Sequence, residues 1–189
     1  MSVILHALLL DIPELLLTER LALQATRAGM GASIEAAVAE SHEAIARWMP
    51  WANEPQQAGT SERHCREMQV KWHAREELDF CLLDRGDGTL IGKASLHTID
   101  WALPRFEIGY WVRSSCTRRG FATEATLGLV DFARDRLGAH RVEIGSDTRN
   151  AASRRVAEKC GFELEGIRRN ARRDTSGAIA DSCMYARIF

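Results

Sequence analysis

The feature that most constrains this chain is an apolar strand pattern that runs into a helical pattern through a short basic turn. The stretch "FEIGYWV" alternates its side chains between two faces and ends at Val112, and a helical stripe begins at Phe121. Between them, Arg118 and Arg119 precede Gly120. The first N–H groups of a helix have no partner within the helix, and the helix dipole adds positive potential there. The turn is therefore expected to bind an anion.

The composition of the turn favours a pyrophosphate as that anion. Gly120 lets the backbone approach a ligand closely, and the two arginines can donate charge-assisted hydrogen bonds to phosphate oxygens. Arg113, at the end of the strand, is a further candidate for such a bond. The turn is neither a GxxxxGK[ST] loop nor a GxGxxG loop, so the two common nucleotide-binding signatures do not describe it.

Size and charge predict one globular domain over residues 1–189 with an anionic ligand. Hydrophobic residues make up 46% of the 189 positions, charged residues make up 27%, and the net charge is −1. The first 100 residues hold 9 Lys and Arg against 15 Asp and Glu, whereas the last 89 hold 16 against 11. This asymmetry indicates either an anionic ligand bound by the C-terminal half or arginines scattered over a solvated surface.

The cysteines and the N-terminal segment indicate where in the cell the protein is expected to be. Five cysteines occur without a CxxC pair, which favours reduced thiols in a cytoplasmic protein and argues against a zinc site. The opening stretch "MSVILHALLLDIPELLL" is interrupted by Asp11, Pro13 and Glu14, so we interpret it as a core-packing or dimer-packing segment. A signal peptide or membrane span is not expected there.

The periodicity along the chain predicts an α/β domain with a mixed sheet, because strands and helices alternate in the second half. The predicted elements are a strand at 18–26, helices at 30–48 and from 61 to about 75, two hairpin strands flanking Gly86–Gly88, a strand at 105–114, a helix at 121–137, a strand at 141–148, a helix capped by Asn150 and closed at Gly161, and strands at 162–170 and 180–189.

Around this turn, the sequence resembles the GNAT superfamily of acetyltransferases. The segment "TRRGFA" is similar to its acetyl-coenzyme A loop, [Q/R]xxGx[G/A], with Gly120 and Ala122 at the small positions and Thr117 where Gln or Arg is usual. The segments "EIGYWV", "ATEA" and "NAASRRVAEKCGFELEG", with "LTERLALQ", "WMPWA" and "LIGKASL", resemble the RimJ/RimL branch of ribosomal-protein N-acetyltransferases. The resemblance extends over roughly residues 15–187.

This resemblance implies a single GNAT-type domain whose mixed sheet, flanked by helices, splays at the coenzyme site. It implies acetyl-CoA as the co-substrate, no metal, and a pantetheine arm held between the strands that match "EIGYWV" and "VEIGS". The residues assigned to coenzyme binding, from the turn and from the resemblance together, are Tyr110, Trp111, Val112, Arg113, Arg118, Arg119, Gly120, Phe121, Ala122, Thr123, Asn150 and Arg155.

Acetylation of an amine needs a base, because an alkyl amine has a pKa of roughly 10 and an α-amine one of about 8. Glu107, on the strand face of Gly109 and Trp111, is the candidate base, acting through a water; the alternative is a surface or salt-bridged carboxylate. Ser153 is the candidate acid for the departing thiolate, because Ala157 stands where many relatives have tyrosine. The alternative is a serine that bonds its own helix start.

Other side chains leave more than one interpretation. Trp48 and Trp51 either line an acceptor pocket or pack as core and lid. The basic segment "RRNARRD", residues 168–174, meets an acidic partner or forms a solvated hairpin loop. His97 is interpreted as structural, His64 and His73 as helix-surface residues, and Cys116 as incidental.

These observations predict an acetyl-CoA-dependent N-acetyltransferase that acts on the N-terminal α-amine of a protein such as a ribosomal protein. Two alternatives stay open: a small amine as the acceptor, such as a polyamine, amino acid or antibiotic, and a coenzyme-binding module without turnover. A nucleotide-dependent kinase is disfavoured, because a lysine-containing phosphate loop and metal-binding carboxylates are missing. Direct DNA or membrane binding is not expected, and a homodimer is an expectation from the family.

Overall fold

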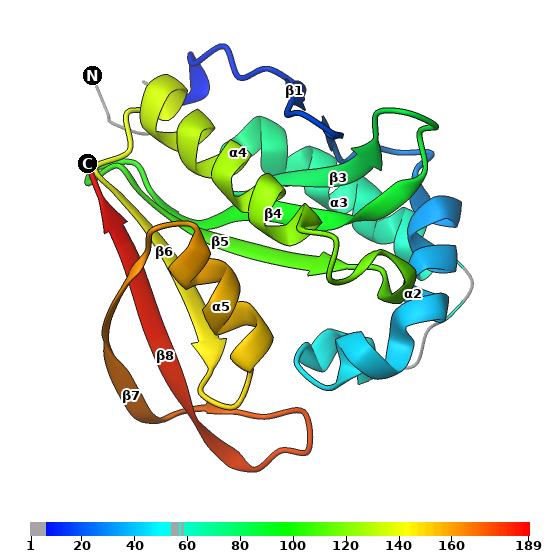
Figure 1. Cartoon of the computed structure of the whole chain (residues 1–189). Helices are drawn as coiled ribbons and strands as arrows, with labels where there is room; N and C mark the ends of the chain where they lie inside the picture. Colours follow the sequence, from blue (N-terminus) through cyan, green and yellow to red (C-terminus); the bar gives the residue numbers. More distant parts are fainter. Residues whose placement is uncertain (1–6, 54–56, 58) are drawn as a thin grey trace.

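The chain folds around one eight-stranded mixed sheet, with strands in the order β1-β2-β3-β4-β5-β6-β8-β7 (Figure 1). The computed structural model describes residues 7–53, 57 and 59–189. Each neighbouring pair of strands is antiparallel except β5 and β6, which are parallel. The strands are β1 (Leu15–Leu17), β2 (Leu21–Ala25), β3 (Leu78–Asp84), β4 (Leu90–Asp100), β5 (Arg105–Val112), β6 (Arg141–Asp147), β7 (Glu163–Arg173) and β8 (Ile179–Ile188).

Helices cover both faces of this sheet. They are α2 (Gly31–Ala46), α3 (Thr60–Ala74), α4 (Phe121–Leu137) and α5 (Ala151–Lys159), with 3₁₀ turns η1 (Pro50–Asn53) and η2 (Ser114–Cys116). In Figure 1, α4 and α5 lie in front of the sheet, and α2 and α3 lie behind it. The apolar stripe of α4 packs into the main core, whereas Ile34 and Val38 of α2 form a second cluster with Cys65 of α3. The five cysteines are all buried and free.

The predicted α/β fold is confirmed, and the helix at 121–137 has the predicted bounds. Two segments differ. The strand β1, which pairs Leu16 with Leu23 of β2, was not predicted, because three residues are too few to show an alternation. The basic run 168–173 was offered as part of a loop, but it lies within β7, and the turn follows at Asp174–Gly177. Nearly every residue of β7 is exposed, so no buried face marks it as a strand.

The N-terminal segment is only partly described. Residues 1–6 of the predicted packing segment lie outside the described residues, whereas Ala7 and Ile12 are buried. Among the described residues, no helix is long and apolar enough to span a membrane.

The sheet opens between β5 and β6. The two strands pair only from Arg105 to Glu107 on β5 and from Arg141 to Glu143 on β6. Beyond Glu107, β5 pairs with β4 alone, while β6 pairs with β8 as far as Asp147. The strands therefore diverge where the chain leads into α4, which leaves backbone groups of both available to a ligand.

Candidate active site

The opening in the sheet forms a cavity of about 720 Å³, here called the β5–β6 cleft. Its walls come from the facing ends of the two strands and from the N-terminal ends of α4 and α5. The lining residues include Ile108–Val112, Thr117, Arg118, Gly120–Thr123, Ile144–Asp147, Asn150, Ser153, Arg155 and Trp48. Most of the residues predicted to bind the coenzyme therefore share one cavity, and the exceptions are Arg113 and Arg119, which are not part of its lining.

The turn at the mouth of this cleft is held in a left-handed conformation. Gly120 has a φ of 85° and directly precedes α4, and Arg118 has a φ of 61°. Arg20 donates a hydrogen bond from Nη1 to the carbonyl oxygen of Arg119 at 2.9 Å, and its Nε contacts Glu124 at 2.7 Å. A Cβ on Gly120 would meet only Arg20 Nη2, at 3.4 Å. The backbone conformation, more than crowding, is therefore what requires glycine here.

Two of the predicted arginines are occupied outside the cleft. Arg113 forms an ion pair with Glu40 of α2 and donates to the Leu90 carbonyl at 3.2 Å. Hydrogen bonds from Ser115 and Arg113 lower the pKa of Glu40 to about 2, so this carboxylate is ionised at neutral pH. The guanidinium of Arg119 lies 4.8 Å from the centre of the Phe121 ring. A role for either arginine in coenzyme binding stays a prediction that requires its side chain to move.

The two polar side chains predicted at the start of α5 face the cleft. Asn150 caps the helix, because its Oδ1 accepts a hydrogen bond from the Ser153 N–H at 3.1 Å. The Ser153 hydroxyl does not bond its own helix start; it lies 3.0 Å from the Tyr110 hydroxyl of β5. Burial raises the pKa of Tyr110 to about 12, so the phenol keeps its proton at neutral pH and can donate to Ser153.

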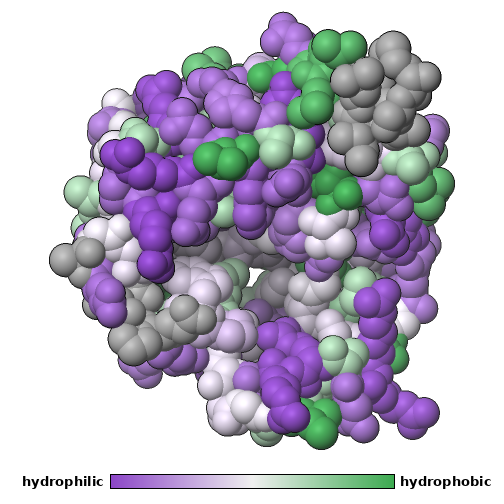
Figure 2. All heavy atoms as spheres, turned by 180° about the vertical axis from the view of Figure 1, so that it is seen from behind, coloured by the Kyte–Doolittle hydropathy of each residue, from purple (hydrophilic) through white to green (hydrophobic). Residues whose placement is uncertain are grey.

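A second cavity, of about 590 Å³, lies between α3 and strands β3, β4 and β5 and is here called the α3 cavity. Figure 2, seen from behind, shows the surface hollowed near its centre on this side of the molecule. Gly109, Tyr110, Trp111 and Met49 line both this cavity and the β5–β6 cleft. Trp51 lines only the α3 cavity. The two cavities therefore meet at the middle of β5.

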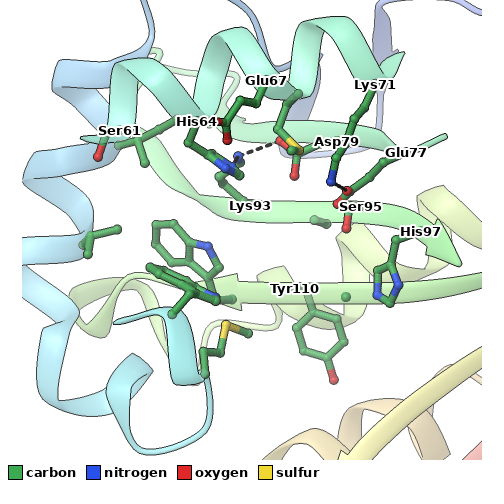
Figure 3. A pocket seen from close by; sticks show the side chains of 18 of the residues that line it. Ser61, His64, Glu67, Lys71, Glu77, Asp79, Lys93, Ser95, His97 and Tyr110 are labelled. Carbon is green, nitrogen blue, oxygen red and sulfur yellow. Dashed lines mark hydrogen bonds and ion pairs between the residues drawn. The ribbon is translucent and has the colours of Figure 1, made fainter. Parts of the chain in front are cut away.

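The α3 cavity has a polar wall that the sequence analysis did not find. Figure 3 shows charged and histidine side chains converging on it from α3 and from the strands. The side chain of Lys93 is only 5% exposed and pairs with Asp79 at 2.6 Å, and its Nζ lies 2.8 Å from His64 Nε2. Lys71 pairs with Glu77 at 3.0 Å. The sequence did carry a signal for this wall, because Asp79 and Lys93 are charged residues inside otherwise apolar strands. A charge that is buried in a strand needs a partner.

The prediction that His64 lies on a solvated helix surface was wrong. The side chain lines the α3 cavity and turns inward because Lys93, on the facing strand β4, donates to it. Burial lowers the pKa of His64, and the nearby charge of Lys93 lowers it further. The imidazole is therefore neutral in the folded protein at pH 7.

This lowered pKa predicts that the free energy of unfolding decreases as the pH is lowered below about 6.5. The unfolded chain binds a proton on His64 below a pH of about 6.5, whereas the folded chain does not, so folding loses up to about 1.4 kcal/mol per pH unit below that value. Urea unfolding between pH 7.5 and 5.5 measures the slope. His64→Gln, which keeps an acceptor for Lys93, should flatten it. His73→Gln, at an exposed position of the same helix, should leave it unchanged, and equal slopes in all three proteins would contradict the assignment.

The predicted base, Glu107, lies at the point where β5 and β6 separate. A Cβ on Gly145 of β6 would lie 2.8 Å from Glu107 Oε1, so the carboxylate rests against the backbone of the neighbouring strand. Glu107 is absent from the linings of both cavities. Cys116 is buried and lines the β5–β6 cleft. Among the described residues, no group of three His, Cys, Asp or Glu side chains is arranged to hold a metal ion.

Comparison with known proteins shows which proteins this chain resembles. The family described as "Acetyltransferase (GNAT) domain" matches residues 20–163. YdaF of Bacillus subtilis (strain 168), provisionally named a ribosomal N-acetyltransferase, is 31% identical over 136 residues, which span 70% of this chain and 72% of YdaF. Among solved structures, the microcin C7 self-immunity acetyltransferase MccE, in complex with acetyl-CoA and AMP, has a TM-score of 0.85 at 20% identity and covers 91% of this chain and 94% of its own.

A second solved structure has the same fold. RimL, described as a ribosomal L7/L12 alpha-N-protein acetyltransferase in complex with coenzyme A, has a TM-score of 0.85 at 21% identity, with 94% of this chain and 97% of RimL covered. The likeness of these structures concerns the fold, whereas the family match extends over most of the chain at the level of sequence. From the match to residues 20–163 and the relationship to YdaF, the chain belongs to the GNAT family of acetyltransferases.

Proposed function

We propose that this protein transfers an acetyl group from acetyl-CoA to the N-terminal α-amine of a protein, such as a ribosomal protein. The observation that carries the proposal is that two cavities meet on opposite sides of Gly109–Trp111. The β5–β6 cleft would hold the coenzyme, with its pyrophosphate at the turn before α4 and its thioester beside these residues. The α3 cavity would hold the acceptor, and the names of YdaF and RimL support a protein N-terminus as that acceptor.

In this reaction the neutral amine attacks the thioester carbon, and the carbon–sulfur bond then breaks. Backbone N–H groups at Tyr110–Val112 would stabilise the oxyanion of the tetrahedral intermediate. The amine loses one proton to a base before the attack, with Glu107 as the proposed recipient through a water. The second nitrogen proton reaches the departing thiolate through Ser153. The protonated Tyr110 hydroxyl supports this role because it can donate to Ser153 Oγ and leave the serine proton free.

The acceptor is tested by release of the coenzyme thiol. Purified protein and acetyl-CoA would be mixed separately with peptides beginning with Ser, Ala or Met, with lysine peptides, with polyamines and with aminoglycosides. Turnover with a peptide N-terminus, absent when that N-terminus is blocked, is the expected result. Turnover with small amines only would keep the chemistry and reject the protein acceptor. Coenzyme binding without turnover on any member would favour the non-catalytic module.

A small amine is the second candidate, because the α3 cavity, at about 590 Å³, is of the size that encloses a small molecule. Trp51, in that cavity, then contributes a rigid wall for the acceptor, whereas Trp48 lines the β5–β6 cleft. Homodimer formation remains a prediction from the resemblance, and a cytoplasmic location remains a prediction from the unpaired cysteines.

Ser153→Ala tests the proposed acid. We expect kcat to fall by roughly 10-fold with little change in KM for acetyl-CoA, because a thiolate leaves readily and general acid assistance contributes only part of the rate. Steady-state kinetics on the acceptor found above measure this. Ser182→Ala in β8, outside both cavities, is the matched control and should leave kcat unchanged. A kcat of Ser153→Ala equal to that of the control would reject the role.

A further inference from the structure

His97, at the end of β4, lies where the two cavities meet. A Cβ on Gly109 would lie only 3.0 Å from His97 Nε2, so the imidazole rests against the Gly109 backbone. Gly109 lines both cavities, and His97 lines the α3 cavity. Figure 3 shows the ring reaching from β4 toward β5 beside this cavity. A nitrogen at this point is close to where an amine in the α3 cavity would reach a thioester in the β5–β6 cleft.

The backbone at His97 is shaped to hold the ring in this orientation. The pairing of β4 with β5 is regular up to His97 and Glu107, and it shifts before Asp100 and Arg105. Such irregularities re-aim side chains and are common beside active sites. Thr98 has a φ of 50°, which is unfavourable for a β-branched residue, and its Oγ1 lies 2.9 Å from His97 Nδ1. In the tautomer whose Nδ1–H donates to Thr98, the lone pair of His97 lies on Nε2, and this is the tautomer that the inference below requires.

The other ionisable side chains of the α3 cavity are engaged. Lys93 is paired with Asp79 and also donates to His64, which occupies the Nε2 lone pair of that imidazole. The Tyr110 hydroxyl is bonded to Ser153.

The remaining charged groups of the α3 cavity are also unsuited to accept a proton from an amine. Lys71 is paired with Glu77. Glu67, which also lines the cavity, lies 3.7 Å from Arg63, and both of these side chains are more than half exposed to solvent. His97 Nε2 has no hydrogen-bond partner among the residues that the structure describes. It is therefore the basic nitrogen of this cavity that is free to accept a proton.

Glu107 completes the arrangement from the next strand. It is the cross-strand neighbour of His97 in the β4–β5 pairing, and neighbouring side chains on one face of such a pair lie close together. Gly109 leaves space for the imidazole, and Gly145 leaves space for the carboxylate. The carboxylate and the imidazole therefore lie on the same face of the β4–β5 pair.

We infer that His97 is the general base of acetyl transfer, in place of the water through which Glu107 was proposed to act, and that Glu107 acts through this imidazole. The inference deepens the proposed function and rests on the transfer of acetyl to an amine, whichever amine that is. The ammonium group of the acceptor gives one proton to His97 Nε2, and the resulting neutral nitrogen attacks the thioester carbon. The imidazolium, beside Glu107, then releases this proton to solvent. The second nitrogen proton leaves with the thiolate, so the products are the amide, the free thiol and one proton.

The test is His97→Gln, assayed with any amine that the acceptor panel identifies. We expect kcat/KM to fall about 100-fold at neutral pH, as for loss of a general base, while the dissociation constant of coenzyme A stays within about 2-fold of the original. The pH profile of log kcat/KM should also change in the variant, because the glutamine side chain cannot take up a proton as an imidazole can. The groups facing His97 that also titrate or carry charge are Glu107 and the Lys71–Glu77 and Lys93–Asp79 pairs.

Controls separate this role from a structural one. His73→Gln, on the exposed side of α3, should retain full activity. Glu107→Gln should lower kcat/KM less than His97→Gln, and the double variant should match His97→Gln alone, because both act on one proton. A His97→Gln variant within about 3-fold of the original would overturn the inference.

A spectroscopic measurement decides the inference even if no amine in the panel is acetylated. The ¹⁵N shifts of labelled histidines, with His97 assigned from the variant, report the tautomer. We expect the Nδ1–H form of His97 at pH 8, and the Nε2–H form would overturn the role as base. Absence of turnover with the whole panel would count against the proposed function, whereas the wrong tautomer would count against His97 alone.

Discussion

Replacing Gly92 with alanine is expected to destabilise the protein by about 4 kcal/mol, at the upper end of the effects of a single buried substitution. Gly92 lies in β4 opposite Val112. A Cβ there would lie 2.1 Å from the Trp111 carbonyl oxygen and 2.9 Å from the Val112 Cα. Because both contacts are backbone atoms, no side chain can rotate away to relieve them. The β4–β5 pair would have to separate at the residues that form the wall between the two cavities.

Urea unfolding followed by circular dichroism measures this change. The matched control is Gly166→Ala in β7, where a Cβ would meet no atom within 4 Å and the backbone has no positive φ. The control should change the free energy of unfolding by less than about 1 kcal/mol. If Gly92→Ala were as stable as the control, β4 and β5 would not approach each other as closely at this point as the structure has them.

The sequence was sufficient to predict most of the residues that gather at the β5–β6 cleft, because they come from short local segments of the chain. The turn, the start of α4 and the cap of α5 can each be recognised from a few consecutive residues. Gly120 directly precedes α4, and Asn150 caps α5. The structure adds a reason for glycine at Gly120, namely its φ of 85°, while the close approach of a ligand to this backbone stays a prediction. Torsion angles are not visible in a residue pattern.

The α3 cavity could not be predicted in this way, because it is assembled from distant segments. His64 comes from α3 and Lys93 from β4, and only the packing of that helix on that strand brings them to 2.8 Å. The pairing of Arg113 with Glu40 is likewise a contact across 73 positions of the chain. His97 next to Gly109 depends on the register of β4 against β5, which the sequence does not state.

Replacing Gly120 with valine is expected to weaken coenzyme A binding about 100-fold, which corresponds to roughly 3 kcal/mol. A β-branched residue is strongly disfavoured at a φ of 85°, so the turn would leave the left-handed region. The N–H groups that begin α4 would then point away from the ligand, and each lost charge-assisted hydrogen bond costs about 1.5–3 kcal/mol. Titration calorimetry with coenzyme A measures the dissociation constant.

The same helix supplies the control for this change. Gly138 ends α4 with a φ of 67° and no atom within 4 Å of a Cβ, so Gly138→Val imposes similar backbone strain far from the cleft. Both variants should unfold more readily, but only Gly120→Val should lose coenzyme affinity. If both lost affinity equally, the effect would come from the stability of α4. If neither did, the pyrophosphate would have to bind elsewhere, and the arginines of the turn would lose their proposed role with it.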